Sequence, residues 1–347
     1  MPAIDRMRRV CITGGAGFLG SNLAERLSAA GVEVVIVDRP RGRRKRASDS
    51  RRSRHIRRVE GDVLDPAVLE HAIDGCDWIF HLQANADVRT GLEHPRRDLE
   101  RSTLATANVL EAMRARGVKR VMFASSAAVY GEPKVVPTPE DAPFPLQTSL
   151  YGASKLAGEG LLAAYANGCG FTALICRFVS ILGEGYSHGH LLDFYCALTQ
   201  DPTRLHVLGD GRQRKSYVYV QDAIAAILTA IERHHREPGA HIYNVGTDET
   251  STVADSARLV AAHLSLSPKI EYGGGRRGWQ GDNPLLQLDT TRIRALGWQP
   301  RLTIREAIVR TLEWLDANEH IWWEHSNRGA IHGRPFDANP AAAKARA

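Results

Sequence analysis

The sequence predicts an α/β fold in which a doubly wound parallel sheet carries a smaller, mostly C-terminal lobe. Two observations support this prediction. Apolar runs of strand length alternate with segments of helical periodicity through the first half of the chain, a pattern typical of a parallel sheet covered by helices. From residue 182 onward the alternation becomes irregular, beginning with a segment of glycines and histidines at 183–190, so we expect the smaller lobe to start there.

A glycine-rich turn follows the first predicted strand, at 10–12, and opens the first predicted helix, at 21–30. Its sequence, TGGAGFLG, satisfies GxGxxG with Gly15, Gly17 and Gly20. These glycines permit a tight turn and close approach of the backbone to a pyrophosphate, which the helix N-terminus attracts. The turn therefore predicts a phosphate cradle.

The second apolar run, at 32–37, ends in Asp38, about 20 residues beyond the glycines. A carboxylate there can accept hydrogen bonds from both ribose hydroxyls of a dinucleotide, and it repels a 2′-phosphate. The cradle and Asp38 together predict a Rossmann fold that binds NAD in preference to NADP.

The remaining elements follow from periodicity and from the positions of proline. Strands are expected at 56–59, 78–82, 119–126 and 171–181, and helices at 66–73, 97–116 and 151–165. The helix at 97–116 should bury one stripe, formed by Leu99, Thr103, Thr106, Leu110 and Met113. Residues 132–149 contain five prolines and should form a loop. In the second half we expect a strand and helix over 216–231, a strand at 242–245, and helices at 191–199, 253–264 and 304–317.

This order of elements predicts two domains and a tail. The NAD-binding domain should cover residues 1–181, with 216–250 returning to it, and the substrate-binding lobe should comprise 182–215 and 251–320. Residues 325–347 are expected to form a poorly ordered tail.

The composition is that of a soluble globular protein, with 347 residues of which 43% are hydrophobic. The sequence has no apolar run of the roughly 18 residues that a membrane span requires and no signal-peptide pattern, which predicts a cytoplasmic protein. Five cysteines without a CxxC pair predict reduced thiols. His188, His190 and the pair at 234–235 lack a third ligand at metal-binding spacing, so we expect no metal.

Basic residues are concentrated at 39–58, where eleven of them stand against one acidic residue, a local charge of +10. Such a cluster could contact nucleic acid. The alternative is a solvated loop after the second strand that helps to attract an anionic nucleotide. We favour the loop because no aromatic residue is interleaved with the arginines.

A candidate acid–base centre combines Tyr151 and Lys155 with Ser126. The tyrosine and lysine are four positions apart on a predicted helix and hence share one face. The ammonium of Lys155 should lower the pKa of Tyr151, so that the phenolate takes a proton from an alcohol while hydride leaves the same carbon for a nicotinamide. Ser126 lies at a strand end, where parallel sheets bind ligands, and can hydrogen-bond to the same oxygen.

The motifs TGGAGFLG, GDVLD, a strand ending in FHL, SSAAVYG and YGASK occur in the order that is typical of one family. In this set the chain, over about residues 8–316, resembles the extended short-chain dehydrogenases/reductases that act on nucleotide sugars. The resemblance implies catalytic Ser126, Tyr151 and Lys155, and bound NAD. The cofactor contacts that it implies are Gly14, Gly17, Phe18, Leu19, Gly20, Asp38, Asp62, Val63 and Lys155.

The resemblance also implies a lobe that clamps a nucleoside diphosphate sugar and a homodimer built on the helices that begin near Arg97 and Tyr151. Segments similar to the family's substrate motifs place Ser180, Lys215 and Arg277 at the diphosphate, beside Ser126 and Tyr151 at the sugar. Ser180 and Lys215 stand where the family usually has Asn and Arg, and lysine cannot form the bidentate fork of arginine. Base and hexose therefore stay open.

The reaction is predicted from the residues that follow Ser126. Dehydratases and decarboxylases of the family place an acidic residue in this segment, whereas Ala127 and Ala128 are inert. This favours C4 epimerisation of a UDP-hexose through a transient 4-keto sugar, as in the UDP-glucose 4-epimerases. The alternatives are a net dehydrogenase or reductase, an epimerase acting at another carbon or on another nucleotide, and a nucleic-acid-binding or regulatory protein that uses residues 39–58.

Overall fold

A computed structural model describes residues 3–40, 54–85, 88, 91–143, 146–279 and 281–321. Most of the arginine-rich segment, residues 41–53, and the whole predicted tail at 325–347 lie outside the described residues. Within the described ranges, no helix is both long and apolar enough to cross a bilayer.

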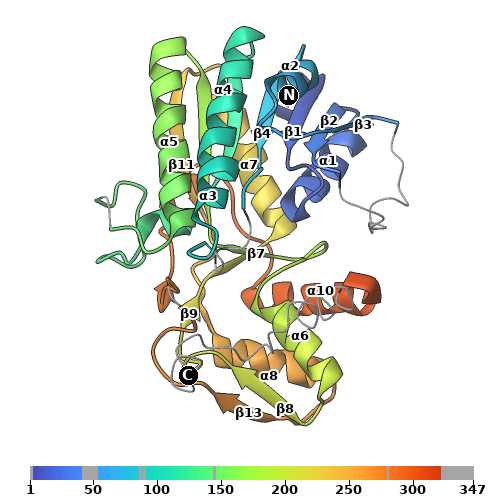
Figure 1. The fold of residues 1–347 in the computed structure, drawn as a ribbon, viewed down its shortest axis with the longest axis vertical. Helices are drawn as coiled ribbons and strands as arrows, with labels where there is room; N and C mark the ends of the chain where they lie inside the picture. The colour runs from blue at the N-terminus through green and yellow to red at the C-terminus, as the bar shows by residue number, and fades with distance from the viewer. Residues whose placement is uncertain are drawn as a thin grey trace.

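A seven-stranded parallel sheet forms the centre of the upper body in Figure 1. Its strand order is β11, β6, β5, β4, β1, β2, β3. The strands are β1 (Arg9–Thr13), β2 (Glu33–Asp38), β3 (Ile56–Glu60), β4 (Trp78–His81), β5 (Arg120–Ser126), β6 (Thr172–Phe178) and β11 (Gly239–Val245). The order reverses between β1 and β4, the place where open α/β sheets bind ligands. The predicted Rossmann fold is confirmed.

Helices cover both faces of the sheet, which explains why its inner strands are largely buried. One face packs against α1 (Phe18–Ala29) and α7 (Val220–His234), and the other against α2 (Pro66–Ile73), α4 (Ala105–Ala115) and α5 (Leu150–Cys169). Two separate apolar cores result, one on each side of the sheet.

Two predicted elements are broken. The helix expected at 97–116 consists of α3 (Pro95–Asp98), a π-helical segment η3 (Leu99–Leu104) and α4. Because a π-helix bonds i to i+5, it rotates preceding side chains out of the α-helical register. The prediction that Leu99 is buried is wrong, since the residue is 57% exposed. The strand expected at 171–181 ends at Phe178, and β7 (Ser180–Leu182) pairs with β10 (Tyr217–Tyr219) outside the main sheet.

The lower body in Figure 1 is built around α6 (His190–Gln200), α8 (Val253–His263) and α10 (Ile304–Asp316), which share a third apolar core. Capping boxes start α8 and α10, with Thr252 and Thr303 as the N-caps. Short strand pairs edge this body: β8 (Arg204–Val207) with β13 (Lys269–Tyr272), and β9 (Arg214–Lys215) with β12 (Ser251–Thr252) and β14 (Leu285–Leu286).

Candidate active site

The turn between β1 and α1 is shaped by backbone approaches that only glycine permits. Gly14 has φ +69°, and a Cβ on Gly20 would lie 2.6 Å from the Gly14 carbonyl oxygen. The N-cap of α1 is Gly17, which has no side chain to accept a hydrogen bond from the N–H groups of the first helical turn. This arrangement fits the pyrophosphate of a dinucleotide.

Asp38 lies at the carboxyl end of β2, next to the cradle. Its carboxylate accepts hydrogen bonds from the backbone N–H groups of Ala16 and Arg39, each at 3.0 Å. A cavity of about 510 Å³ opens beside it, lined by Asp38, Arg39, Pro40, Asp62, Gln83 and Ala84. Val63 is buried next to Asp62. The carboxylates of Asp38 and Asp62 both line this cavity, an arrangement that fits the adenosine half of NAD.

Phe18 and Asn22 connect the cradle to the loop between β7 and α6. The Phe18 ring meets Tyr186 edge-on, with centroids 6.0 Å apart, and the Asn22 amide donates to the Glu184 carbonyl oxygen at 2.8 Å. Leu19 packs against the core of the same sheet face. The smaller lobe therefore begins in contact with the cradle.

Ser126, Tyr151 and Lys155 come together where β5 ends and α5 begins. Ser149 caps α5 by accepting from the Gly152 N–H at 3.0 Å, which sets the start of the helix one residue before Tyr151. The Lys155 ammonium donates to the Ala124 carbonyl oxygen at 2.6 Å and lies 5.9 Å from the Tyr151 ring centroid. The structure thus brings the three predicted catalytic residues to one point.

The expected lowering of the Tyr151 pKa is not found. Burial raises the pKa of Tyr151 to about 12, and a hydrogen bond with Ser126 offsets only part of this effect. Burial lowers the pKa of Lys155 to about 7, with the negative charge of Glu159 acting in the opposite direction. The reason is that burial disfavours the charged form of both groups and outweighs the hydrogen bond from Ser126 and the charge of Glu159.

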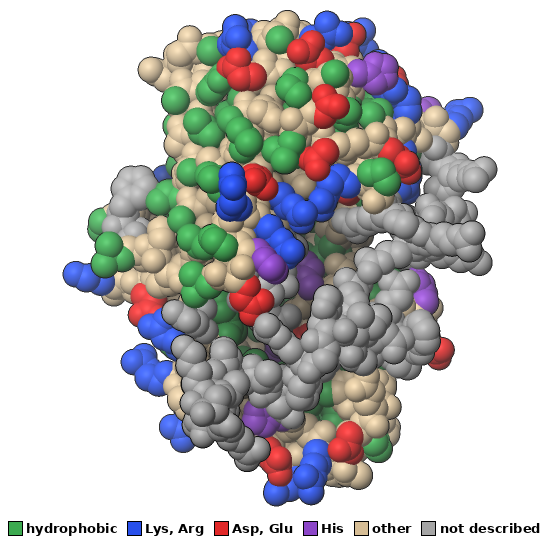
Figure 2. Space-filling view, in the orientation of Figure 1, with side chains coloured by type: hydrophobic (Ala, Val, Ile, Leu, Met, Phe, Trp, Pro, Cys, Tyr) green, Lys and Arg blue, Asp and Glu red, His purple; other side chains and the backbone are tan. Residues whose placement is uncertain are grey.

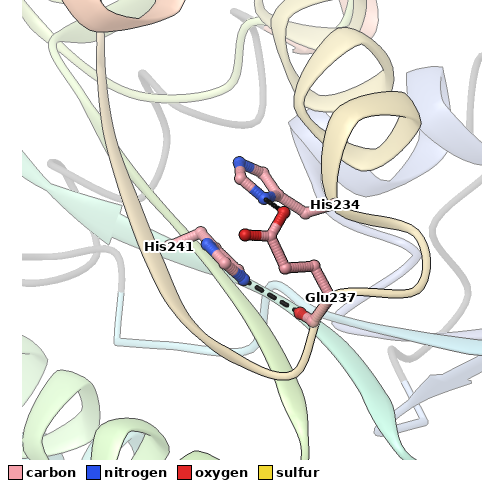
Figure 3. A group of neighbouring side chains, drawn as sticks. All are labelled: His234, Glu237 and His241. Carbon is pink, nitrogen blue, oxygen red and sulfur yellow. Dashed lines mark hydrogen bonds and ion pairs between the residues drawn. The ribbon is translucent and has the colours of Figure 1, made fainter.

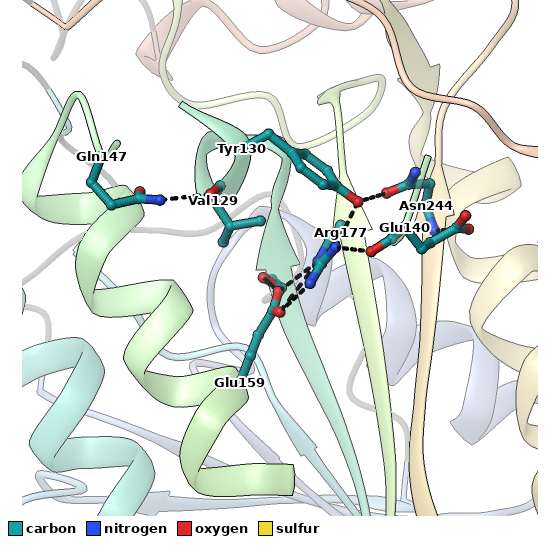
Figure 4. Close-up of polar contacts among 8 residues, drawn as sticks. Val129, Tyr130, Glu140, Gln147, Glu159, Arg177 and Asn244 are labelled. Atoms are coloured by element: carbon teal, nitrogen blue, oxygen red, sulfur yellow. Dashed lines mark hydrogen bonds and ion pairs between the residues drawn. The ribbon is translucent and has the colours of Figure 1, made fainter. Parts of the chain in front are cut away.

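Glu159 belongs to a buried polar network that the sequence prediction missed (Figure 4). Its carboxylate accepts from Arg177 Nε at 3.0 Å and from Arg177 Nη2 at 2.6 Å, and also from the Ser125 hydroxyl. Arg177 Nη1 donates to Tyr130 Oη at 2.7 Å, and the Tyr130 hydroxyl donates to Asn244 at 2.8 Å. The network joins α5, β6 and β11 to Ser125, the residue before Ser126 on β5. The spacing of Glu159, four residues beyond Lys155, was the available signal.

The predicted diphosphate contacts Lys215 and Arg277 are both ion-paired. Lys215 pairs with Asp282 and donates to the Asn283 carbonyl oxygen at 2.6 Å, while Arg277 pairs with Glu132. The Asn283 amide donates to the Gly131 carbonyl oxygen at 2.7 Å. Asn283 is thereby held against the residues that follow Ser126, and an anionic ligand must compete with the two carboxylates.

Ser180, the third predicted diphosphate contact, is on β7 and Asp98 is on α3. Ser180 is exposed at the first position of β7, paired in register with Tyr217. Asp98, which the sequence prediction missed, is buried, accepts from the Asn85 amide at 3.2 Å, and contributes to raising the pKa of Tyr151. The burial of Asp98 and its effect on Tyr151 could not be predicted from the sequence, because the segment before Asp98 has no regular periodicity.

Two of the histidines pack against aromatic rings, and His234 lies in a group of possible ligands. His188 stacks on Tyr186 and His190 packs edge-on against Phe194. The prediction that His234 lacks further ligands is wrong, because the turn after α7 places Glu237 and His241 beside it.

The phosphate cradle lies at the switch point of a parallel sheet, and a serine, a tyrosine and a lysine meet at the end of β5, two strands away. Together they define a dinucleotide-binding α/β enzyme. The model of the NAD dependent epimerase/dehydratase family matches residues 10–246, and the chain belongs to this family. The predicted relationship is confirmed, as is NAD as the cofactor of the family.

Relatives within the family carry out more than one reaction. The UDP-glucose 4-epimerase of Mycolicibacterium smegmatis is 32% identical over 316 residues, which cover 88% of this chain and 97% of that protein. The UDP-glucuronic acid decarboxylase 4 of Arabidopsis thaliana is 27% identical over 312 residues, which cover 87% of this chain and 67% of that protein. Membership alone therefore leaves the reaction open.

Solved structures agree in fold along nearly their full length. A UDP-galactose 4-epimerase superposes with a TM-score of 0.79 at 36% identity, covering 89% of this chain and 99% of that one. The UDP-glucose 4-epimerase of Thermus thermophilus, solved as a complex with NAD, gives a TM-score of 0.77 at 29% identity with the same coverage.

Proposed function

We propose that this enzyme epimerises a UDP-hexose at C4, using tightly held NAD and a transient 4-keto sugar. One observation carries the proposal: Ser126, Tyr151 and Lys155 converge beside the cradle, and the segment after Ser126 offers only Ala127 and Ala128. With no acidic side chain at those two positions, the site is suited to removing and returning one proton. The UDP-hexose 4-epimerases among the relatives and solved structures support this choice.

In this mechanism Tyr151 takes the proton of the C4 hydroxyl and later returns it. Tyr151 is half-buried, and Ser126, which hydrogen-bonds to it, would hold the same sugar oxygen. Bound NAD supplies a hydride acceptor and then a hydride donor at C4. Because the free phenol is neutral at pH 7, Tyr151 needs a nearby cation to ionise. We assign this role to the charged form of Lys155, whose ammonium lies 5.9 Å from the centre of the tyrosine ring.

The UDP moiety is assigned to the smaller lobe. Lys215 and Arg277 would exchange Asp282 and Glu132 for the diphosphate, and Ser180 would lie at the edge of the same site. Both cations contact the segment that packs against the residues after Ser126. We therefore expect a diphosphate bound there to leave the sugar within reach of Tyr151. A sugar anchored in this way can rotate about its phosphate bonds and present either face to the hydride.

The test is proton NMR of UDP-galactose, UDP-glucose and their N-acetyl counterparts with the purified enzyme, with nicotinamide absorbance followed in parallel. We expect C4 interconversion without net NADH. Tyr151→Phe should reduce turnover by at least about 10²-fold while NAD stays bound, and Tyr165→Phe, on the same helix but bonded to exposed Glu111, should leave it unchanged. No interconversion of any substrate would refute the reaction, and stoichiometric NADH would favour a net dehydrogenase.

A homodimer through the outer faces of η3, α4 and α5 completes the proposal. Leu99 and Leu104 are 57% and 47% exposed, and hydrophobic side chains are visible across the α4 and α5 surface in Figure 2. Apolar exposure of this kind suits a partner helix pair. Sedimentation of the purified protein gives the oligomeric state directly, and a monomer at micromolar concentration would contradict it.

A further inference from the structure

A second group of polar side chains lies away from the proposed active site, where α7 ends and the edge strand β11 begins (Figure 3). His234 is the last residue of α7, Glu237 lies in the following turn, and His241 is the third residue of β11. One ligand atom from each residue lies within 4.8 Å of the other two. Across the part of the chain that the structure describes, no other trio of His, Cys, Asp or Glu meets this condition.

The hydrogen bonds of the two rings define which nitrogen each can offer to a ligand. His241 Nε2 lies 2.9 Å from the Glu237 carbonyl oxygen, which can only accept, so Nε2 carries the proton and Nδ1 the lone pair. His234 Nδ1 lies 2.9 Å from the Glu237 carboxylate, and its Nε2 lies 2.7 Å from the Tyr243 hydroxyl. Each ring therefore has Nε2 held by an oxygen of the protein.

This is the pattern of metal-ligating histidines, whose second nitrogen donates to a carbonyl or hydroxyl oxygen that orients the ring. A cation on Nδ1 of His234 selects the tautomer whose proton is on Nε2, and that nitrogen lies 2.7 Å from the Tyr243 hydroxyl oxygen, which can accept from it.

We propose that His234, Glu237 and His241 bind one divalent transition metal ion, with Zn²⁺ as the best match, through Nδ1 of each histidine and a carboxylate oxygen. Two imidazoles and one carboxylate are a common zinc donor set, with water in the fourth position. The His234 side chain is 8% exposed and that of Glu237 is 47% exposed, so one ligand is fixed and the carboxylate is open to an ion from solvent.

One neighbouring cation opposes binding. Arg233 Nη1 contacts the Glu237 carboxylate at 2.7 Å, but the Arg233 side chain is 57% exposed and can swing into water. The rings of His234 and His241 are stacked, with centroids 3.7 Å apart, so the His241 ring must turn before both Nδ1 atoms can face one ion. The 4.8 Å spread of the ligand atoms must also contract, which the position of Glu237 in a turn permits. A bound ion would link the end of α7, through His234, to β11, through His241. Val245, the last residue of β11, lies level with Ser126 across the sheet, and His241 lies four residues earlier on β11. The site is therefore separate from the proposed catalytic centre.

The test uses the full-length protein without an affinity tag, stripped with chelator and titrated with ZnCl₂ by calorimetry. We expect one equivalent bound by the wild type and at least tenfold weaker binding by His241→Ala and by Glu237→Ala. His263→Ala, which removes a histidine paired with Asp316 in the other lobe, should bind like the wild type. Co²⁺ should give the visible absorption of a tetrahedral site in the wild type and in His263→Ala, and not in the two ligand variants.

Metal-free circular dichroism of each variant establishes that it is folded before titration. The proposal is overturned if the wild type shows no saturable Zn²⁺ uptake, or if folded His241→Ala and Glu237→Ala retain it unchanged. Loss of uptake in His263→Ala alone would place the ion elsewhere and would equally overturn the assignment.

Discussion

Arg177→Met should destabilise the protein by about 3–5 kcal/mol, the usual cost of leaving one partner of a buried ion pair uncompensated. The Arg177 and Glu159 side chains are 8% and 5% exposed, and the guanidinium makes a two-pronged contact with the carboxylate. Without it, the Glu159 carboxylate still accepts from the Ser125 hydroxyl but has lost the cation that balances its charge. Methionine preserves most of the volume, so the cost should come from the stranded charge rather than from a cavity.

Urea unfolding at a fixed NAD concentration measures this loss, since a ligand that binds only the folded state would otherwise shift the midpoint. Arg258→Met is the matched control: Arg258 pairs with Asp255 at 2.5 Å, but the side chains are 62% and 48% exposed, so the change should stay within about 0.5 kcal/mol. Adding Glu159→Gln to Arg177→Met should recover part of the loss by removing the orphan charge. The reasoning would be refuted if Arg177→Met lost less than about 1 kcal/mol of stability, or if adding Glu159→Gln recovered none of the loss.

Two further predictions concern the nucleotide side of the sheet. Burial lowers the pKa of His81 to about 3, against an ordinary value of 6.5. Between these two pH values the unfolded chain binds one more proton than the folded protein. The free energy of unfolding therefore falls as the pH falls, by up to about 1.4 kcal/mol per pH unit. His81→Gln should flatten this dependence between about pH 6.5 and 4.5 in urea midpoints, and unchanged slopes would contradict it. Gly20→Ala should weaken NAD binding at least tenfold in a calorimetric titration, because the new Cβ would lie 2.6 Å from the Gly14 carbonyl oxygen; Gly160→Ala, which meets nothing within 4 Å, is the control, and equal affinities would argue against the cradle.

The sheet and the cradle could be predicted because both depend on local spacing. A strand, a glycine turn and a helix are encoded within about twenty residues, and so is the alternation that builds a parallel sheet. The π-helical segment at Leu99–Leu104 could not be predicted, since the apolar stripe of 97–116 fits an uninterrupted α-helix equally well. The ion pair of Lys215 with Asp282 joins residues 67 positions apart, which no local pattern specifies.

Within the candidate site, residue identity was predictable and protonation was not. Tyr151 and Lys155 are adjacent on α5 as their spacing requires, but their pKa values depend on burial, which is a property of the assembled fold. The cluster at His234 shows the same limit. Its third ligand comes from β11 across a turn, and only the folded turn places that ring 3.7 Å from the ring of His234.

The charge balance behind Ser126 has a consequence for proton transfer. Glu159 is the acidic group that most supports the Lys155 ammonium, yet its carboxylate is already engaged by Arg177, whose own pKa is raised in the pair. Glu159 therefore offsets only part of the burial of Lys155, and the pKa of the lysine stays at about 7 rather than at its ordinary 10.5. A lysine with this pKa can exist in either charge state near neutral pH. Burial also holds the phenol of Tyr151 in its protonated form, with its pKa raised to about 12, so the tyrosine can act as a base only while a positive charge such as that of Lys155 stabilises the phenolate.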